Sequence, residues 1–164
     1  MNKKKDRSTL AASLDNRLFF RLYQSANMMH KTGTRALEQS HITTQQWAII
    51  GALSRTRVES SNGIAVSDLA AFLMVSRQNL TGLLSRLESR NLIERTVSSE
   101  DSRRRLIRLT EAGQKLWQTD MSQNIGSYYD TALEGFSTTD KIHVIHYLDK
   151  LLENLSALDP DDKS

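Results

Sequence analysis

The sequence contains no cysteine among its 164 residues. Disulfide bonds, thiolate metal sites and cysteine-based redox sensing are therefore excluded within this chain. Proline occurs once, at Pro160, and glycine seven times, so a mostly helical structure is the natural expectation. No segment approaches the roughly 18 apolar residues of a membrane span, and no apolar stretch of a secretion signal follows the charged N-terminus. We therefore expect a cytoplasmic protein with no membrane attachment.

The charge is distributed unevenly along a chain whose length suits one domain with its own core. Residues 76–108 carry eight arginines, no lysine and four carboxylates, whereas residues 109–164 carry a net charge of −6. Arginine suits bidentate contacts to phosphate and guanine better than lysine does. This distribution indicates a nucleic-acid partner, although an ordinary solvated surface also produces charge runs.

A long first helix is predicted over residues 14–39. Its apolar residues at helical spacing form one stripe, consisting of Leu14, Leu18, Leu22 and Met29. An adjoining arc contains Phe19, Phe20, Tyr23, Asn27 and His30. Because the apolar arc is wide, we expect this helix to contact more than one neighbour, including a partner subunit.

Three shorter helices are predicted next. Thr43 and Gln46 have the spacing of a capping box, which starts a short buried helix. Ser67 and Ser76 are predicted to cap two further helices that only Val75 separates, the arrangement of a helix-turn-helix. The second of these helices has an inward stripe made of Leu80, Leu83, Leu84 and Leu87.

The hydrophobic period changes after Asn91. The runs LIERTV and RRLIRLT have strand character, and SSEDSR between them has the composition of a turn. A two-stranded hairpin directly after a helix-turn-helix is a wing. The predicted fold is therefore mainly α with a small β wing, a winged helix-turn-helix.

Two helices are predicted after the wing. Thr110 begins a long helix that runs to about residue 134, and Ser137 caps the last helix. The apolar side of the first contains Leu116, Trp117, Met121, Ile125 and Tyr128. In the last helix, Ile145, Leu148, Leu152 and Leu155 are spaced three, four and three residues apart. This coiled-coil-like seam predicts a partner helix.

The outward side chains of the second helix of the helix-turn-helix are the candidate base-reading residues. Arginine, glutamine and asparagine near a helix start pair with guanine and adenine edges in the major groove. Small hydroxyls allow the backbone to approach phosphate, and we expect Ser67 to hold a phosphate at a helix N-terminus. A plain polar helix surface is the alternative, but the preceding helix and the following hairpin favour DNA. The candidates are Ser76, Arg77, Gln78, Asn79, Thr81 and Arg86.

The predicted wing tip carries a second candidate site. Ser102, Arg103 and Arg104 are placed to enter a minor groove, whose negative potential is greatest where it is narrow and A·T-rich. Asp101 is interpreted as a brace that orients a nearby arginine. The alternative is an ordinary solvated hairpin with a local ion pair.

The run DSRRRLIRLTEAG over residues 101–113 resembles the wing signature of MarR-family regulators, D-x-R-x-x-x-[IL]-x-L-T-x-x-G, and residues 66–95 resemble that family's helix-turn-helix. The resemblance implies a homodimer on a pseudo-palindromic operator, acting most often as a repressor. It extends over residues 14–157 as a single unit, with the winged helix-turn-helix at about 43–110 and N- and C-terminal dimerisation helices at about 14–39 and 110–157. Residues 1–12 and 159–164 are expected to be mobile.

The resemblance also implies a small-molecule effector, held between the dimerisation helices and the winged lobe. Tyr23, Asn27 and His30 share one arc of the first helix, and Trp47 follows in the second. Aromatic walls with a few polar groups suit an aromatic carboxylate or its coenzyme A thioester. Simple core and dimer packing is the alternative for each residue. The phrase LMVSRQNLTGLLSRLE is similar to family members that control aromatic-acid catabolism.

Other functions are less well supported by the sequence. There is no nucleophile with a base at suitable spacing, no glycine-rich phosphate loop and no metalloprotease motif, so we expect neither an enzyme nor a cofactor. His143 and His146, three residues apart, are interpreted as surface or interface residues, not as metal ligands. A helical protein-interaction adaptor without base-specific DNA binding would explain the last helix but not the arginine-rich hairpin.

Overall fold

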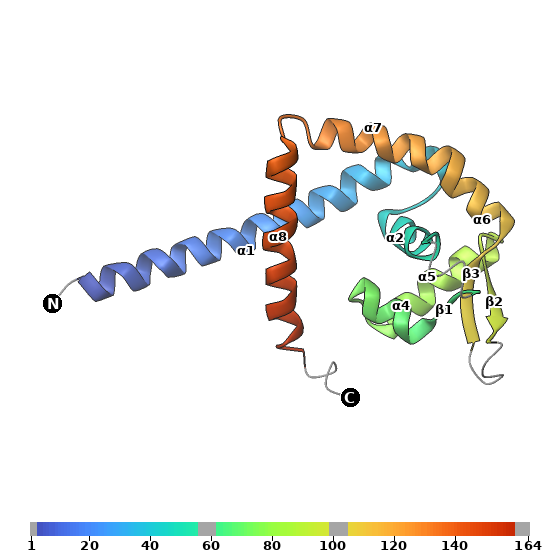
Figure 1. Ribbon diagram of the computed structural model, residues 1–164, viewed down its shortest axis with the longest axis horizontal. Helices are drawn as coiled ribbons and strands as arrows, with labels where there is room; N and C mark the ends of the chain where they lie inside the picture. Colours follow the sequence, from blue (N-terminus) through green and yellow to red (C-terminus); the bar gives the residue numbers. More distant parts are fainter. Residues whose placement is uncertain (1–2, 56–61, 99–104, 160–164) are drawn as a thin grey trace. The chain divides into compact units, whose positions relative to one another are not determined.

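A computed structural model describes residues 3–55, 62–98 and 105–159. The chain divides into two compact units, Met1–Tyr128 and Tyr129–Ser164. The first unit contains most of the helices and a small three-stranded antiparallel sheet, and the second is built on one long helix. The predicted fold class, mainly α with a small β wing, is confirmed (Figure 1).

The first helix, α1 (Lys3–Ala36), begins well before residue 14 and ends before residue 39. The predicted long helix is therefore present, but both of its predicted bounds are wrong. A 3₁₀ turn (Glu38–Ser40) follows, and His41 then adopts a left-handed conformation with φ of 52°. The 3₁₀ turn and the left-handed residue after it direct the chain into the next helix.

The second helix, α2 (Thr44–Leu53), starts with the predicted capping box. The Thr43 hydroxyl accepts from the Gln46 amide at 3.3 Å, and the Gln46 side-chain oxygen accepts from the Thr43 amide at 3.0 Å. The two bonds satisfy N–H groups that a helix start otherwise leaves unpaired.

The predicted helix pair is present as α4 (Val66–Leu73) and α5 (Arg77–Ser89). Ser76 caps α5 as expected, since its hydroxyl accepts from the Asn79 amide at 3.3 Å. The predicted cap at Ser67 is wrong: α4 begins at Val66, and Ala65 is the cap residue. The reason is that Ile64 and Ala65 form strand β1, so the chain leaves its extended conformation at Ala65, before it reaches the serine.

The sheet has the order β1-β3-β2, with β2 (Ile93–Val97) and β3 (Arg105–Leu109) forming the predicted antiparallel hairpin directly after α5. The predicted turn between them lies largely outside the described residues. Strand β1 (Ile64–Ala65), paired with the other edge of β3, was not predicted because two residues show no period. Gly63 before it has φ of 123°, and a Cβ there would lie 2.6 Å from the Ile107 carbonyl oxygen. Only glycine fits this approach.

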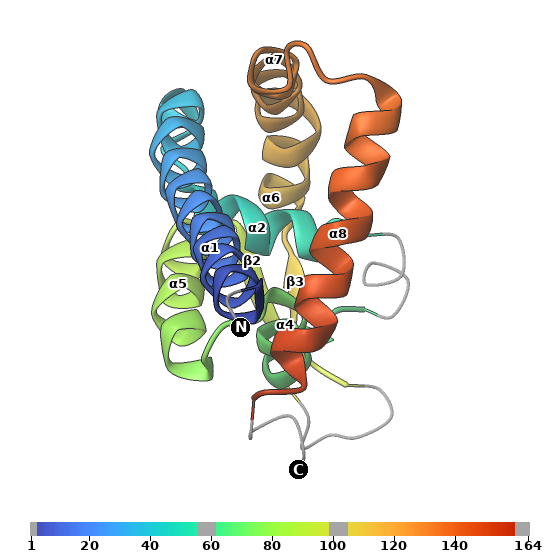
Figure 2. The ribbon, with the colours of Figure 1, turned by 90° about the vertical axis from the view of Figure 1, so that its left-hand side faces the viewer.

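After the sheet, Thr110 caps a helix as predicted, its hydroxyl accepting from the Gly113 amide at 3.1 Å. The helix runs through α6 (Glu111–Leu116), a π-helical turn (Trp117–Met121) and α7 (Ser122–Ala132), three segments that follow one another without a gap (Figure 2). The π turn is a departure from the uniform helix expected.

The second unit contains α8 (Thr138–Ser156), capped by Ser137 as predicted. Its cap is a full capping box with Asp140. No helix in the described parts of the chain combines the length and the apolarity needed to span a bilayer.

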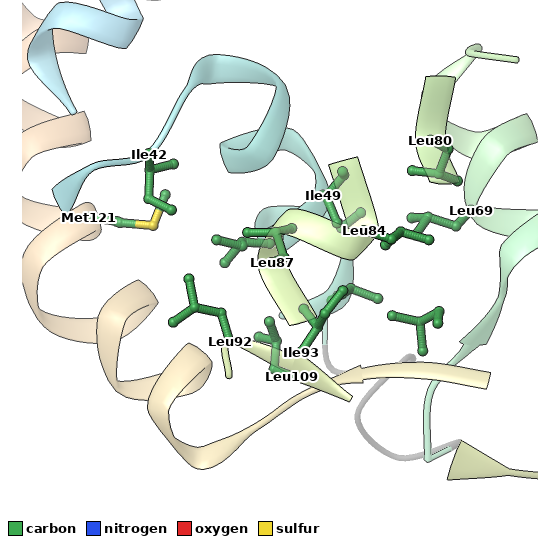
Figure 3. Close-up of a cluster of buried hydrophobic side chains, with 14 of the residues drawn as sticks. Ile42, Ile49, Leu69, Leu80, Leu84, Leu87, Leu92, Ile93, Leu109 and Met121 are labelled. Carbon is green, nitrogen blue, oxygen red and sulfur yellow. The ribbon is translucent and has the colours of Figure 1, made fainter. Parts of the chain in front are cut away.

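The core of the first unit lies where α2, α4 and α5 meet the sheet (Figure 3). Three leucines of α5 are completely buried and Leu83, the fourth residue of the predicted stripe, is half-buried. The sheet contributes its inward-facing isoleucines and leucines. This burial fixes which side of α5 is left to solvent. The residues include Ile49, Leu69, Leu80, Leu84, Leu87, Ile93, Ile107 and Leu109.

Candidate nucleic-acid interface

The side of α5 opposite its buried leucines is exposed along its whole length. Leu80, Leu84 and Leu87 have no accessible surface, whereas every predicted base-reading side chain is exposed. We call this surface the outer face of α5, and it consists of Arg77, Gln78, Asn79, Thr81, Gly82, Ser85 and Arg86. The cap residue Ser76, also exposed, adjoins it.

Hydroxyl groups on α5 are occupied by its own backbone. Thr81 donates to the Arg77 carbonyl oxygen at 2.8 Å, and Ser85 donates to the Thr81 carbonyl oxygen at 3.1 Å. Within the described residues, the side chains of Arg77, Gln78 and Asn79 form no hydrogen bond or ion pair. The donors best suited to guanine and adenine edges are therefore the ones left available.

Not all arginines of residues 76–108 contribute to this face. Arg95 forms a fork with the Glu88 carboxylate, with N–O distances of 2.7 and 3.2 Å. Arg108 bonds to Glu94 at 2.7 Å and to the Asn62 side-chain oxygen at 2.6 Å. These two arginines stabilise the hairpin and its junction with α5. The count of eight arginines in residues 76–108 therefore overstates how many guanidinium groups are available to a nucleic acid.

Arg90 has a structural role that sequence reasoning missed. It directly follows α5 and donates to the carbonyl oxygens of His41 at 2.6 Å and Ser40 at 3.1 Å. These contacts tie the end of α5 to the turn between α1 and α2. No local pattern signals them, because the partners are about fifty residues apart in sequence.

The predicted wing-tip residues Asp101, Ser102, Arg103 and Arg104 lie outside the described residues. The strand that follows them begins at Arg105, whose side chain is exposed. Ser67, the predicted phosphate ligand, lies in the first turn of α4 and is half-buried. Its hydroxyl donates to the Asp68 carboxylate at 3.2 Å.

One of the four predicted effector residues, His30, contacts α2, the helix that contains Trp47. His30 of α1 is hydrogen-bonded through Nδ1 to the Thr44 hydroxyl at 2.8 Å, and Trp47 lies one turn further along α2. The Trp47 indole nitrogen is buried without a hydrogen-bond partner among the described residues. Tyr23 and Asn27 are exposed, Tyr23 to 67%. The four do not form a closed site within one chain.

Two long helices expose apolar surface. On α1 the exposed side chains include Leu14, Leu18, Phe20 and Tyr23, at 52–67%. On α8 the predicted seam, made of Ile145, Leu148, Leu152 and Leu155, is 39–59% exposed. His143 and His146 of α8 contact the Tyr147 ring, with ring centroids 6.4 and 5.3 Å apart. A shallow hollow in this unit is lined by Phe136, Asp140, His143 and Tyr147, and includes none of the predicted effector residues.

These features define a winged helix-turn-helix with an outward-facing polar helix, the class of protein that reads duplex DNA. The family model for the MarR family matches residues 42–104. The chain is 51% identical to the transcriptional activatory protein BadR of Rhodopseudomonas palustris, over 89% of this chain and 82% of that one. It is 31% identical to the homoprotocatechuate degradative operon repressor of Escherichia coli, over 74% and 76%. Its fold is similar to that of S. aureus MepR in a DNA complex, with a TM-score of 0.69 and 26% identity, covering 82% of this chain and 96% of that one.

The chain belongs to the MarR family and is a DNA-binding transcriptional regulator. Its relatives and structural neighbours are regulators, not enzymes, so the expectation of a non-enzyme is confirmed. The family resemblance inferred from residues 66–95 and 101–113 is confirmed as well.

Proposed function

We propose that two copies of this chain bind a pseudo-palindromic duplex, each placing α5 in a major groove. The observation that carries the proposal is the outer face of α5, where Arg77, Gln78 and Asn79 are exposed on the side opposite the completely buried leucines of this helix. Side chains at the start of a recognition helix contact base edges, and these three types match guanine and adenine. Thr81, Arg86 and Ser76 complete the proposed contact surface.

The proposed contacts outside the major groove come from residues before and after α5 in the chain. The wing contacts proposed are Ser102, Arg103 and Arg104, with Asp101 as the brace. Arginines inserted in a narrow minor groove are favoured by its negative potential. Ser67, in the first turn of α4, is proposed to bind a phosphate near that helix N-terminus.

A homodimer accounts for the apolar surface of the long helices. Each of the two helices exposes several large apolar side chains, and such exposed apolar surface marks interaction sites. The exposed faces of α1 and α8 fall within residues 14–39 and 110–157, the segments proposed as dimerisation helices. The spacing of Ile145, Leu148, Leu152 and Leu155 fits packing of helix on helix.

A small aromatic acid, or its coenzyme A thioester, is proposed as the effector. Support comes from His30 and Trp47, which lie close to the α1–α2 junction, and from the buried, unpartnered indole nitrogen of Trp47 among the described residues. Tyr23 and Asn27 are proposed to complete the pocket in the dimer. The aromatic class of ligand also agrees with the name of one relative, the repressor of a homoprotocatechuate degradative operon.

Repression is the proposed mode of control, with the effector releasing the protein from its operator. The homoprotocatechuate relative is named a repressor. Activation is the second candidate, favoured by the higher identity to a protein named activatory. A reporter driven by the bound promoter separates them: deletion of the gene raises expression under repression and lowers it under activation.

The experiment that tests the proposal selects binding sites from a random duplex pool and then titrates salt. Binding to the selected duplex should weaken steeply as salt rises, since released counterions drive association. Sedimentation of the complex should give two chains per duplex. Absence of any salt-dependent duplex binding would contradict the DNA proposal, and a one-chain complex would contradict the dimer.

A further inference from the structure

Gly82 lies in the middle of α5, on its outer face, and is exposed. A Cβ built at this position would meet no atom within 4 Å. Three other helical glycines differ: a Cβ at Gly33 would lie 2.6 Å from the Thr44 side chain, one at Gly51 would lie 3.0 Å from the Trp117 ring, and one at Gly113 would collide with the Leu92 carbonyl oxygen. Gly126 of α7 also has open space around it, but it is half-buried and lies outside the candidate interface. Packing within the chain therefore explains Gly33 and Gly113 but not Gly82.

Backbone conformation does not explain Gly82 either. It lies inside the regular helix α5, and the glycines with positive φ are Gly63 and Gly135 among the described residues. Glycine in a helix interior is unfavourable relative to alanine, because it loses more conformational freedom on folding. Gly82 therefore weakens α5, and no contact within the described part of the chain requires the absence of a side chain at this position.

The position of Gly82 places it among the proposed base-reading residues. Side chains three and four residues apart share one face of a helix, so Gln78, Asn79, Ser85 and Arg86 surround it. Leu80, Leu84 and Leu87 are completely buried on the opposite side of α5. A methyl group at residue 82 would project from the outer face, one turn beyond Asn79.

We propose that Gly82 is the point of closest approach between α5 and duplex DNA. This inference rests on the proposed DNA contact of α5. Without a side chain at residue 82, the helix backbone can come close to the groove, and Gln78 and Asn79 one turn earlier can reach base edges. Gly82 acts as a positioning residue: it makes no polar contact through a side chain, and it sets the depth at which the helix sits.

The test compares Gly82→Ala and Gly82→Met with the unchanged full-length protein on the duplex selected from a random pool. Because alanine and methionine are better helix formers than glycine, the melting temperature of the free protein should rise, by about 2–4 °C per 1 kcal/mol for a chain of this size. Affinity for the selected duplex should fall about tenfold or more for alanine, and further for methionine, since the added atoms lift the helix from the groove.

Ser89→Ala is the matched control. Ser89 lies on α5 near its C-terminal end, and its hydroxyl donates to the Arg86 carbonyl oxygen at 2.9 Å. The substitution also favours the helix but adds no bulk, so DNA affinity should be unchanged. Sedimentation of all variants should show the same assembly as the unchanged protein, which separates a DNA effect from a dimer effect.

The outcomes separate this inference from the function on which it rests. Equal affinity of Gly82→Ala and the unchanged protein would overturn the inference while leaving DNA binding intact. A lower melting temperature in Gly82→Ala would overturn it too, because the fold itself would then need the glycine. If the unchanged protein binds no duplex in a salt-dependent way, the proposed function fails first.

Discussion

The guanidinium of Arg90 donates to the carbonyl oxygen of His41 at 2.6 Å. Arg90 is the cap residue that directly follows α5, and His41 has the left-handed conformation at the turn between α1 and α2. The contact thus joins the candidate base-reading helix to the end of the helix that contains His30.

Replacing Arg90 with methionine should lower the free energy of unfolding by about 1–2 kcal/mol. Two hydrogen bonds from a charged donor to backbone carbonyl oxygens are lost, and partial exposure lets water replace some of their stabilisation. Urea denaturation measures the change. Arg90→Lys, which keeps the charge but not the fork, should have an intermediate stability; a methionine variant as stable as the unchanged protein would contradict the structural role.

Thr110 is predicted to be intolerant of valine, which matches its shape but lacks the hydroxyl. Its hydroxyl donates to the Asn91 carbonyl oxygen at 2.6 Å and accepts from the Gly113 amide at 3.1 Å. Losing this cap and leaving both groups unpaired should cost about 1–3 kcal/mol, measured by thermal or urea unfolding. Thr110→Ser keeps the hydroxyl and should recover most of the loss. A valine variant as stable as the unchanged protein would contradict the structural role of the hydroxyl.

Asp140 should make stability depend on pH in the acid range. Hydrogen bonds from the Ser137 hydroxyl and then its amide lower the pKa of this carboxyl below the ordinary 3.8. When the pKa of a carboxyl is lower in the folded state than in the unfolded state, its ionised form stabilises the fold at pH values above the unfolded-state pKa. This stabilisation is lost as the pH falls through the folded-state pKa. The stability difference between the unchanged protein and Asp140→Asn should therefore shrink below about pH 4.

Ser137→Ala provides the companion measurement, because it removes the hydroxyl that donates to Asp140 at 2.6 Å. An NMR titration should then show the Asp140 pKa moving up toward its ordinary value. A pKa unaffected by the loss of the hydroxyl would refute this assignment of cause.

Leu152→Asp should dissociate the proposed dimer. Leu152 is 40% exposed in the single chain and lies in the α8 seam. A charge buried without a partner costs about 3–5 kcal/mol, enough to weaken association by two or more orders of magnitude. Sedimentation measures this loss. Lys150→Asp, on the same helix but outside the seam, is the control; a Leu152→Asp protein that still sediments as a dimer would place the interface elsewhere.

Local signals in the sequence predicted most of the fold. The caps at Thr43, Ser76, Thr110 and Ser137 are formed by side chains that contact the backbone three residues later, and all four are confirmed. The predicted helix cap at Ser67 is wrong because strand β1 pairs with β3, more than forty residues away in sequence. This pairing sets the start of α4.

For the candidate site, the sequence predicted which side chains of α5 are exposed but not which arginines form ion pairs. The exposure of Arg77 and Asn79 follows from the period of the leucine stripe in α5. The pairing of Arg95 and Arg108 with carboxylates depends on strand register and helix packing. A count of arginines in the sequence therefore includes both as candidates for contacts to nucleic acid. The hydrogen bonds of Arg90 could not be predicted from the sequence either, because tertiary packing sets its partners.

Base reading by Arg77 and Asn79 is tested most directly by measuring the affinity of each alanine variant for the selected duplex and for random duplex at one fixed salt concentration. The account predicts a loss of about 1–3 kcal/mol on the selected duplex and little change on random duplex, because a lost base contact removes discrimination. Equal losses on both duplexes, or no loss on either, would contradict it.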